Sequence, residues 1–156
     1  MLKYTDTEVV FKEVPDEITL AINISGCPIH CSGCHSKELW KNIGDELNEE
    51  SLEELIIKNR GISCIGFMGG DNEPKEVERL TKYIHQNHPE IKVAWYSGKE
   101  DISEEINPES FDFIKIGPYI EERGGLDKEG TNQVFYRVNK DGGDLEDITE
   151  RFKPRF

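Results

Sequence analysis

The chain has 156 residues, of which 35% are hydrophobic and 33% charged, and its net charge is −13. This length and composition indicate one globular domain over residues 1–156. The acidic balance disfavours nucleic acid and anionic membranes as partners and favours a cationic protein surface. No apolar run approaches the roughly 18 residues that span a bilayer, and the polar start lacks an apolar signal core, so we expect a cytoplasmic protein.

Apolar segments in the first three quarters of the chain predict strands. The first alternates apolar with small or polar residues, and the later ones are more continuously apolar and end at glycine, as buried parallel strands do. The four predicted strands lie within residues 17–25, 62–70, 91–98 and 111–119. The segment after residue 138 is acidic and is predicted to be a solvated end.

Helical patterns lie between the predicted strands. Ser51 followed by Glu54 is a capping-box pattern that predicts the start of a first helix. An apolar stripe predicts a second helix over residues 74–88, which opens on a proline. The spacing of Ile102 and Ile106 predicts a short third helix.

This alternation of strands and helices predicts an α/β fold with right-handed crossovers. A closed barrel of eight strand–helix units usually needs ~250 residues. The chain is too short for that, so we predict a partial (open) β/α barrel with mainly parallel strands. Its functional residues are then expected at the C-terminal ends of the strands.

The stretch "GCPIHCSGCHS", residues 26–36, carries three of the four cysteines, Cys27, Cys31 and Cys34. In a reducing compartment such a cluster indicates metal binding or catalysis. Three thiolates can hold three irons of a cubic cluster, which normally takes four cysteine ligands. The remaining Cys64 falls within a predicted strand, where a core role is the usual one. One iron would then stay open for chemistry.

Two other interpretations of this loop stay open. Zinc could take the three cysteines together with His30 or His35, although zinc sites usually bring a second C-x-x-C pair, which this chain lacks. The thiols could also be inert and clustered by chance. Both interpretations are weaker than an iron–sulfur cluster.

The spacing of three residues and then two between these cysteines resembles that of the radical S-adenosylmethionine (SAM) enzymes. "GCPIHCSGCHSKELW" further resembles the cluster loop of the anaerobic ribonucleoside-triphosphate reductase activating proteins, which are glycyl-radical activases. "FMGGDNEP", "YSGK" and "KIGPYIEERGGL…TNQVFYRV" are similar to their later strand ends. The resemblance covers roughly residues 15 to 138.

This resemblance implies a single radical SAM domain over residues 1–156. Cys27, Cys31 and Cys34 would hold a [4Fe–4S] cluster, whose fourth iron binds the amino and carboxylate groups of SAM. Reductive cleavage of SAM would then lead to abstraction of a hydrogen atom from a glycine in the large subunit of anaerobic ribonucleoside-triphosphate reductase. A small redox protein would donate the electron.

The resemblance also implies residues for the methionine end of SAM. Gly69, Gly70 and Asp71 match a glycine-glycine-acid motif, and a side chain on Gly70 is expected to weaken SAM binding without unfolding the chain. The family often has glutamate where Asp71 stands, so either Asp71 or Glu73 would accept from the SAM ammonium. The plainer interpretation is a strand-to-helix turn with Asp71 or Asn72 as helix cap.

Other strand ends complete the implied SAM pocket. The backbone of Gly33, Cys34 and His35 would contact adenine, since Gly33 replaces an aromatic residue common in the superfamily. Ser97 and Lys115 would line the pocket by position, with a turn or core role as an equal alternative. Residues 121–138 would face the partner or form a solvated loop, and "QVFYRV" within them, residues 133–138, is predicted to be a strand.

Three functions follow from these patterns. The first is the activase, favoured because a short barrel wall leaves a wide mouth for a folded partner. The second is a radical SAM enzyme for a small molecule, which would need more chain to close its pocket. The third is a non-enzymatic iron–sulfur or zinc protein, such as an electron carrier.

Overall fold

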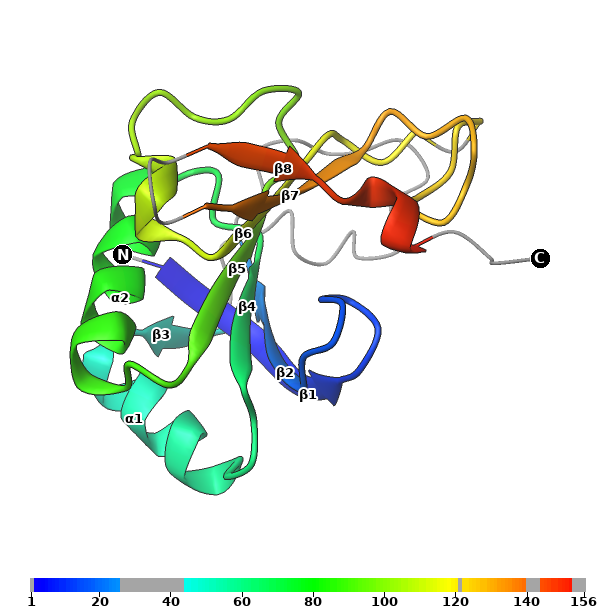
Figure 1. Ribbon diagram of the computed structural model, residues 1–156. Helices are drawn as coiled ribbons and strands as arrows, with labels where there is room; N and C mark the ends of the chain where they lie inside the picture. Colours follow the sequence, from blue (N-terminus) through cyan, green and yellow to red (C-terminus); the bar gives the residue numbers. More distant parts are fainter. Residues whose placement is uncertain (1, 26–43, 121, 140–143, 153–156) are drawn as a thin grey trace.

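The computed structural model describes residues 2–25, 44–120, 122–139 and 144–152. In this part the chain forms one eight-stranded sheet in the order β3-β1-β2-β4-β5-β6-β7-β8, with two α-helices (Figure 1). The predicted cluster ligands Cys27, Cys31 and Cys34, and the predicted adenine contacts Gly33 and His35, lie outside the described residues.

The strands and helices are short, and their bounds are as follows. The strands are β1 (Leu2–Val10), β2 (Thr19–Ile24), β3 (Asp45–Leu47), β4 (Cys64–Met68), β5 (Lys92–Tyr96), β6 (Phe113–Ile116), β7 (Val134–Val138) and β8 (Leu145–Asp147). The helices are α1 (Glu49–Lys58) and α2 (Pro74–Asn87), with the 3₁₀ turns η2 (Pro108–Ser110) and η3 (Thr149–Phe152). The predicted strands contain β2, β4, β5 and β6, and the two longer predicted helices contain most of α1 and α2.

The sheet is mixed. Its central strands β2, β4, β5 and β6 run parallel, whereas β1 and β3 on one flank and β7 and β8 on the other are antiparallel to their neighbours. Within the described residues β3 and β8 are the two edges and do not pair with each other, so the sheet is open. The partial radical SAM barrel stays a prediction.

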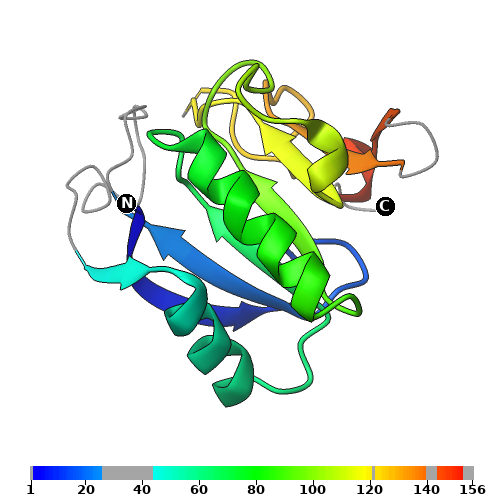
Figure 2. The ribbon, with the colours of Figure 1, turned by 90° about the vertical axis from the view of Figure 1, so that its left-hand side faces the viewer.

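Alternating side chains divide the sheet into a helix-covered face and an opposite face. Figure 2 shows α1 and α2 lying on the same side of the sheet. Buried side chains such as Ile65 and Trp95 form the larger core there, with the Trp95 ring stacked 5.5 Å from Phe111. The opposite face carries a smaller aromatic core around Phe113 and Phe135. Burial on both faces accounts for the nearly continuous apolar character of the central strands.

The start of α1 differs from the predicted capping box. Asn48 is the N-cap, and its Oδ1 accepts from the Ser51 backbone N–H at 2.9 Å. Ser51 is the third helical residue, and its Oγ accepts from the Asn48 N–H at 2.9 Å. The box is therefore real but begins three residues earlier than predicted, because an asparagine supplies the capping oxygen.

The predicted third helix is wrong. Residues 102–106 are irregular, with a turn at residues 104–105, and the 3₁₀ turn η2 follows them. The Ser103 Oγ accepts from the Glu105 N–H at 3.2 Å, a local bond that competes with helix formation. Ile106 is nevertheless buried, so the apolar spacing reflected burial and not helical periodicity.

The acidic C-terminal segment is packed, contrary to the prediction of a solvated end. β8 pairs with β7, and Ile148 is buried. The ring of Phe152 lies 4.9 Å from that of Phe135. These contacts join the C-terminal segment to β7, which lies earlier in the sequence. The composition of the segment alone therefore did not reveal that it is packed.

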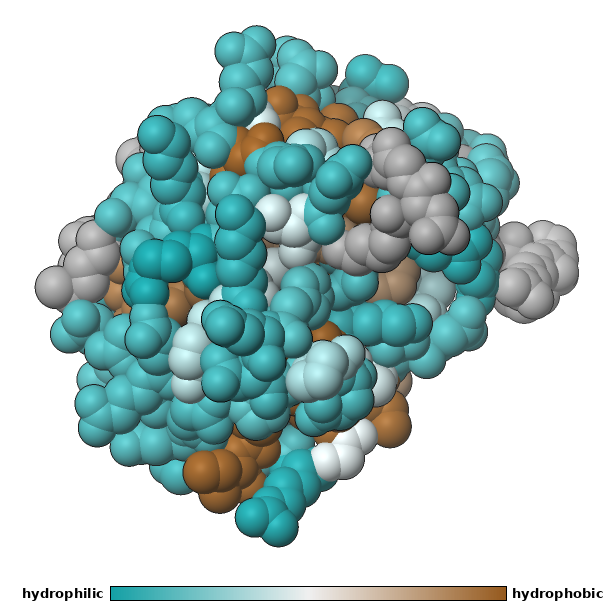
Figure 3. Space-filling view, turned by 60° about the vertical axis from the view of Figure 1, so that its left-hand side comes forward, coloured by the Kyte–Doolittle hydropathy of each residue, from teal (hydrophilic) through white to brown (hydrophobic). Residues whose placement is uncertain are grey.

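The surface is mainly hydrophilic, in keeping with the net charge of −13. Figure 3 shows apolar residues in separate patches on one face of the molecule. The longest helix in the described part, α2, has 14 residues, and none there is long and apolar enough to cross a membrane.

Candidate functional site at the carboxyl edge of the sheet

The candidate site lies where the parallel strands end. Ser25, Gly69, Ser97 and Gly117 directly follow β2, β4, β5 and β6. The register pairs Met68 with Asn23 and with Tyr96, so these strand ends meet at one edge of the sheet. The cysteine loop begins in the sequence directly after Ser25, and thus departs from the same edge.

Asp71 links the end of β4 to the end of β5. Its Oδ1 accepts from the Ser97 hydroxyl at 2.5 Å, and its Oδ2 accepts from the Gly98 N–H at 2.8 Å. The side chain is 4% exposed. Neither Asp71 nor Asn72 caps α2, whose N-cap is Glu73 without a side-chain cap bond. The capping interpretation is therefore wrong, because the carboxylate points to the neighbouring strand.

Lys115 continues this linkage to the next strands. Its Nζ donates to the Gly117 carbonyl at 2.8 Å and to the Ser97 carbonyl at 3.3 Å, although the residue is only 8% exposed. The Gln133 amide also donates to the Gly117 carbonyl, at 3.4 Å. We call these five residues, Asp71, Ser97, Lys115, Gly117 and Gln133, the edge brace. The structure brings Asp71, Ser97 and Lys115 together, as their positions at strand ends predicted.

The glycines of the motif have a structural reason of their own. Gly69 and Gly70 adopt φ of +112° and +93°, which side chains rarely tolerate. A Cβ on Gly70 would lie 2.6 Å from Val77 Cγ2, and one on Gly69 would lie 3.0 Å from the Ile24 carbonyl oxygen. A valine at Gly70 would therefore disturb the fold itself, contrary to the expectation that it affects only SAM.

Cys64 has the core position predicted for it. It is the first residue of β4, pairs with Thr19 and is fully buried. Burial raises the pKa of its thiol to about 12. At about 3.3 Å per residue, Thr19 lies roughly 20 Å along β2 from Ser25. Cys64 is thus at the opposite end of the sheet from the edge where the cysteine loop begins.

Two residues near the site were missed by the sequence reasoning. Tyr96 lies on the same face as Lys115, whose Nζ is 5.9 Å from the Tyr96 ring centroid, within cation–π reach. The alternation of side chains along β5 places Tyr96 on the face opposite Trp95, and this pattern could have indicated its position. Asn132 donates from Nδ2 to the Pro118 carbonyl at 3.0 Å, while its buried Oδ1 has no hydrogen-bond partner. No sequence pattern indicated that role.

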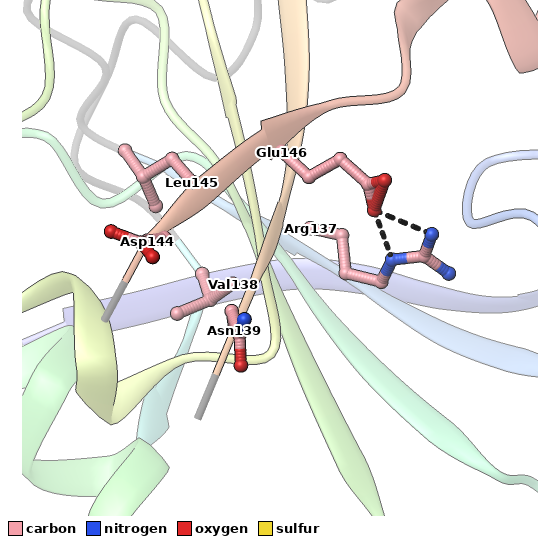
Figure 4. A pocket seen from close by; sticks show the side chains of 6 residues that line it. All are labelled: Arg137, Val138, Asn139, Asp144, Leu145 and Glu146. Carbon is pink, nitrogen blue, oxygen red and sulfur yellow. Dashed lines mark hydrogen bonds and ion pairs between the residues drawn. The ribbon is translucent and has the colours of Figure 1, made fainter. Parts of the chain in front are cut away.

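Several hollows open on the surface of the described residues, and two of them bear on the candidate site. One of about 640 Å³ borders the candidate site and is lined by residues 98–105 and Pro118, several of them acidic. Another lies between β7 and β8 (Figure 4). In the second, Arg137 donates to Glu146 Oε1 at 3.0 and 2.6 Å, so its charge is already neutralised. That pair offers no ready anion site.

The described residues contain no group of three or more His, Cys, Asp or Glu side chains that could hold a metal ion. The predicted ligand set Cys27, Cys31 and Cys34 lies in residues 26–43 and is not among them. The prediction that these three cysteines are the cluster ligands therefore depends on the sequence and on the position of Cys64.

Comparison with known families decides the class of cofactor. Residues 18–120 match the family of the 4Fe-4S single cluster domain. The chain belongs to this family. It is therefore an iron–sulfur protein, and the zinc interpretation is no longer needed. The matched region runs from the start of β2 through the end of β6, and so includes the cysteine loop and most of the edge brace.

One curated relative is a coproporphyrin III ferrochelatase from Enterococcus faecalis (strain ATCC 700802 / V583). It is 32% identical over 79 residues, which are 50% of this chain and 25% of that enzyme. The chain thus matches about a quarter of the relative's length, and the relative's activity does not transfer to it. No solved structure matches the chain.

Proposed function

We propose that the chain is a glycyl-radical activating enzyme of the radical SAM type. It would reductively cleave SAM at a [4Fe–4S] cluster and abstract hydrogen from a glycine of anaerobic ribonucleoside-triphosphate reductase. The observation that carries the proposal is the burial of Cys64 at the far end of the sheet. An iron–sulfur protein with four cysteines then has three left for a cluster of four irons.

The donor set fits such a cluster with one open iron. Cys27, Cys31 and Cys34 would hold three irons, and the fourth would bind the amino and carboxylate groups of SAM. When bound, the reduced cluster supplies the electron that cleaves the sulfonium. The chain's own contribution is to hold both groups at the carboxyl edge of the sheet.

The strand ends offer polar groups for the rest of SAM. The turn at Gly69 and Gly70 would lie beside the methionine end, and Ser97 and Lys115 would lie beneath the ligand. Asn132, whose backbone carbonyl oxygen would lie 3.0 Å from a Cβ on Gly117, also has a buried Oδ1 without a hydrogen-bond partner. The backbone of residues 33–35 would contact adenine, as the resemblance implies.

The partner would be a folded protein. Within the described residues the sheet is open, and the carboxyl edge is bordered by a wide, acidic hollow. A reactive radical must be shielded from water, so a partner surface over this edge would act as the lid. The large subunit of the reductase would supply the glycine, and a small redox protein the electron.

The test is anaerobic reconstitution with iron and sulfide, followed by SAM, dithionite and the candidate reductase. The activase should give 5′-deoxyadenosine and a glycyl-radical doublet in the EPR spectrum of the reductase. A Cys31→Ala variant, which lacks one predicted ligand, should give neither. An electron carrier would leave SAM intact. A small-molecule enzyme would cleave SAM without a protein radical, and either of these outcomes would refute the proposal.

A further inference from the structure

We infer that Asp71 is a positioning residue that acts through Ser97, and that it is not the acceptor for the SAM ammonium. This inference rests on the proposed function, because it concerns how the same site holds its nucleoside ligand. It departs from the role that the glycine-glycine-acid motif implies.

The first step is the direction of the Asp71 carboxylate. Each of its oxygens accepts a hydrogen bond from the end of β5, from the Ser97 hydroxyl at 2.5 Å and from the Gly98 N–H at 2.8 Å. The shorter distance is that of a charge-assisted O–H···O⁻ bond. With 4% of the residue exposed, the carboxylate is turned into the protein and away from an approaching ligand.

The second step is the position of Ser97 as the centre of the edge brace. Its hydroxyl has a single proton, which goes to Asp71, so the oxygen is oriented to accept from the Lys99 N–H at 3.2 Å. Its carbonyl accepts from Lys115 Nζ at 3.3 Å, and its N–H donates to the Lys115 carbonyl at 2.9 Å. Asp71 therefore ties the end of β4 to Ser97, the residue that in turn contacts Lys115 of β6.

The third step is the consequence for a ligand at this edge. The sheet ladder between β5 and β6 ends at Tyr96 and Lys115, and beyond it the Ser97 N–H donates to the Lys115 carbonyl at 2.9 Å and the Gly117 N–H to the Lys99 carbonyl at 2.7 Å. The buried side chains of the edge brace add to the restraint that these single backbone bonds give. A nucleoside that lies across the strand ends needs these backbone groups in fixed places. Loss of the edge brace should therefore lower the affinity for the whole ligand, and not only the contribution of its amino group.

The decisive experiment is a double-mutant cycle on SAM binding to the full chain with its cluster reconstituted. Asp71→Asn and Ser97→Ala should each weaken SAM binding about tenfold, the effect of one lost polar interaction of roughly 1.4 kcal/mol. The double variant should be no weaker than either single one, because the two side chains act as one unit. Ser97→Thr keeps the hydroxyl and should restore most of the affinity.

A second probe separates positioning from direct contact. 5′-Methylthioadenosine lacks the amino and carboxylate groups of SAM. If Asp71 acts through Ser97, Asp71→Asn should weaken this nucleoside and SAM by the same factor. The matched control is Ser63→Ala at the opposite end of β4. The Ser63 hydroxyl also accepts a backbone N–H, that of Ile18 at 3.0 Å, so its loss should leave both affinities unchanged.

Circular dichroism and iron content verify that each variant is folded and loaded. Additive losses in the cycle, or loss of SAM affinity alone with 5′-methylthioadenosine unaffected, would overturn the inference and assign the ammonium to Asp71. If the native chain binds neither compound, the proposed function fails and the inference falls with it.

Discussion

A single buried thiol determines how many cysteines of this chain can reach a cluster. Cys64 lies in the core at the amino end of β4, and its pKa of about 12 leaves almost no thiolate near neutral pH. The position of Cys64, at the opposite end of the sheet from the edge where the cysteine loop begins, argues against ligation. The argument depends on contacts across the sheet, which the cysteine spacing alone cannot provide.

We therefore expect Cys64→Ala to retain the iron and acid-labile sulfide of the native chain after anaerobic reconstitution. Removing one buried heavy atom should lower the free energy of unfolding by roughly 1 kcal/mol. Iron content and urea unfolding measure the two effects. Loss of the cluster in this variant, to the extent expected for Cys31→Ala, would show that Cys64 is a ligand after all.

A comparison of Gly70 with Gly61 separates the cost of a left-handed backbone conformation from the cost of a steric clash. Both have φ near +95°, at +93° and +99°, but a Cβ on Gly61 meets nothing within 4 Å, whereas one on Gly70 meets Val77 Cγ2. Gly61→Ala should cost about 1 kcal/mol of stability, from the backbone alone. Gly70→Ala should cost a further 1–3 kcal/mol from overpacking.

Urea unfolding of both variants tests this difference. Adding Val77→Ala to Gly70→Ala removes the clashing methyl group. The double variant should therefore lose less stability than the sum of the losses in the two single variants. Equal losses at Gly61 and Gly70 would mean that the turn relaxes enough to admit a side chain.

At the scale of elements, the central strands and the two helices were predictable because their signals are local. The apolar runs of β2, β4, β5 and β6 reflect burial on both faces of a parallel sheet. Of the flanking strands, β7 was predicted from "QVFYRV", whereas β1, β3 and β8 were not predictable in this way. β1 reads "LKYTDTEVV" and β8 has three residues, so each owes its conformation to pairing with a distant neighbour.

The two helices are joined by a polar cluster that should make stability depend on pH. Glu53 of α1 accepts from His88 Nε2 and from the Tyr83 hydroxyl, both at 2.8 Å. These bonds, that from His88 first, lower the pKa of Glu53 below its ordinary value of 4.5. Because the folded pKa lies below the unfolded one, the carboxylate stabilises the fold above about pH 4.5, and this contribution is lost as pH falls through the folded pKa.

Glu53→Gln should therefore be less stable than the native chain at pH 7, by under about 1 kcal/mol because the pair is partly solvated. The difference should shrink as pH falls below 4.5. Urea midpoints from pH 7 to pH 3 measure it, with the exposed neighbour substitution Glu54→Gln as control. A difference that stays constant over this range would show that Glu53 contributes through packing and not through its charge.

At the scale of the whole molecule, the place of the candidate site was predictable and its bonding was not. Parallel strands bring their carboxyl ends to one edge, so Asp71, Ser97 and Lys115 had to converge. Which group each side chain contacts depends on the depth of burial and on neighbouring strands. The sequence therefore left open whether Asp71 or Glu73 would accept from the SAM ammonium, whereas the structure shows that the Asp71 carboxylate accepts from Ser97 and Gly98.

The open sheet and the net charge of −13 together make a kinetic prediction about the proposed partner. Without the reductase, SAM cleavage should be slow, because the proposed lid is the surface of the reductase and water reaches the reacting groups in its absence. With it, each 5′-deoxyadenosine should accompany about one glycyl radical.

Docking of a cationic partner surface on an acidic chain weakens with salt, so this coupling should fall as ionic strength rises, while cleavage without the reductase should not change. The measurement is 5′-deoxyadenosine per radical spin across a salt series, with and without the reductase. Fast cleavage by the chain alone, with no response to the reductase, would mean that the edge closes over a small molecule and needs no protein lid.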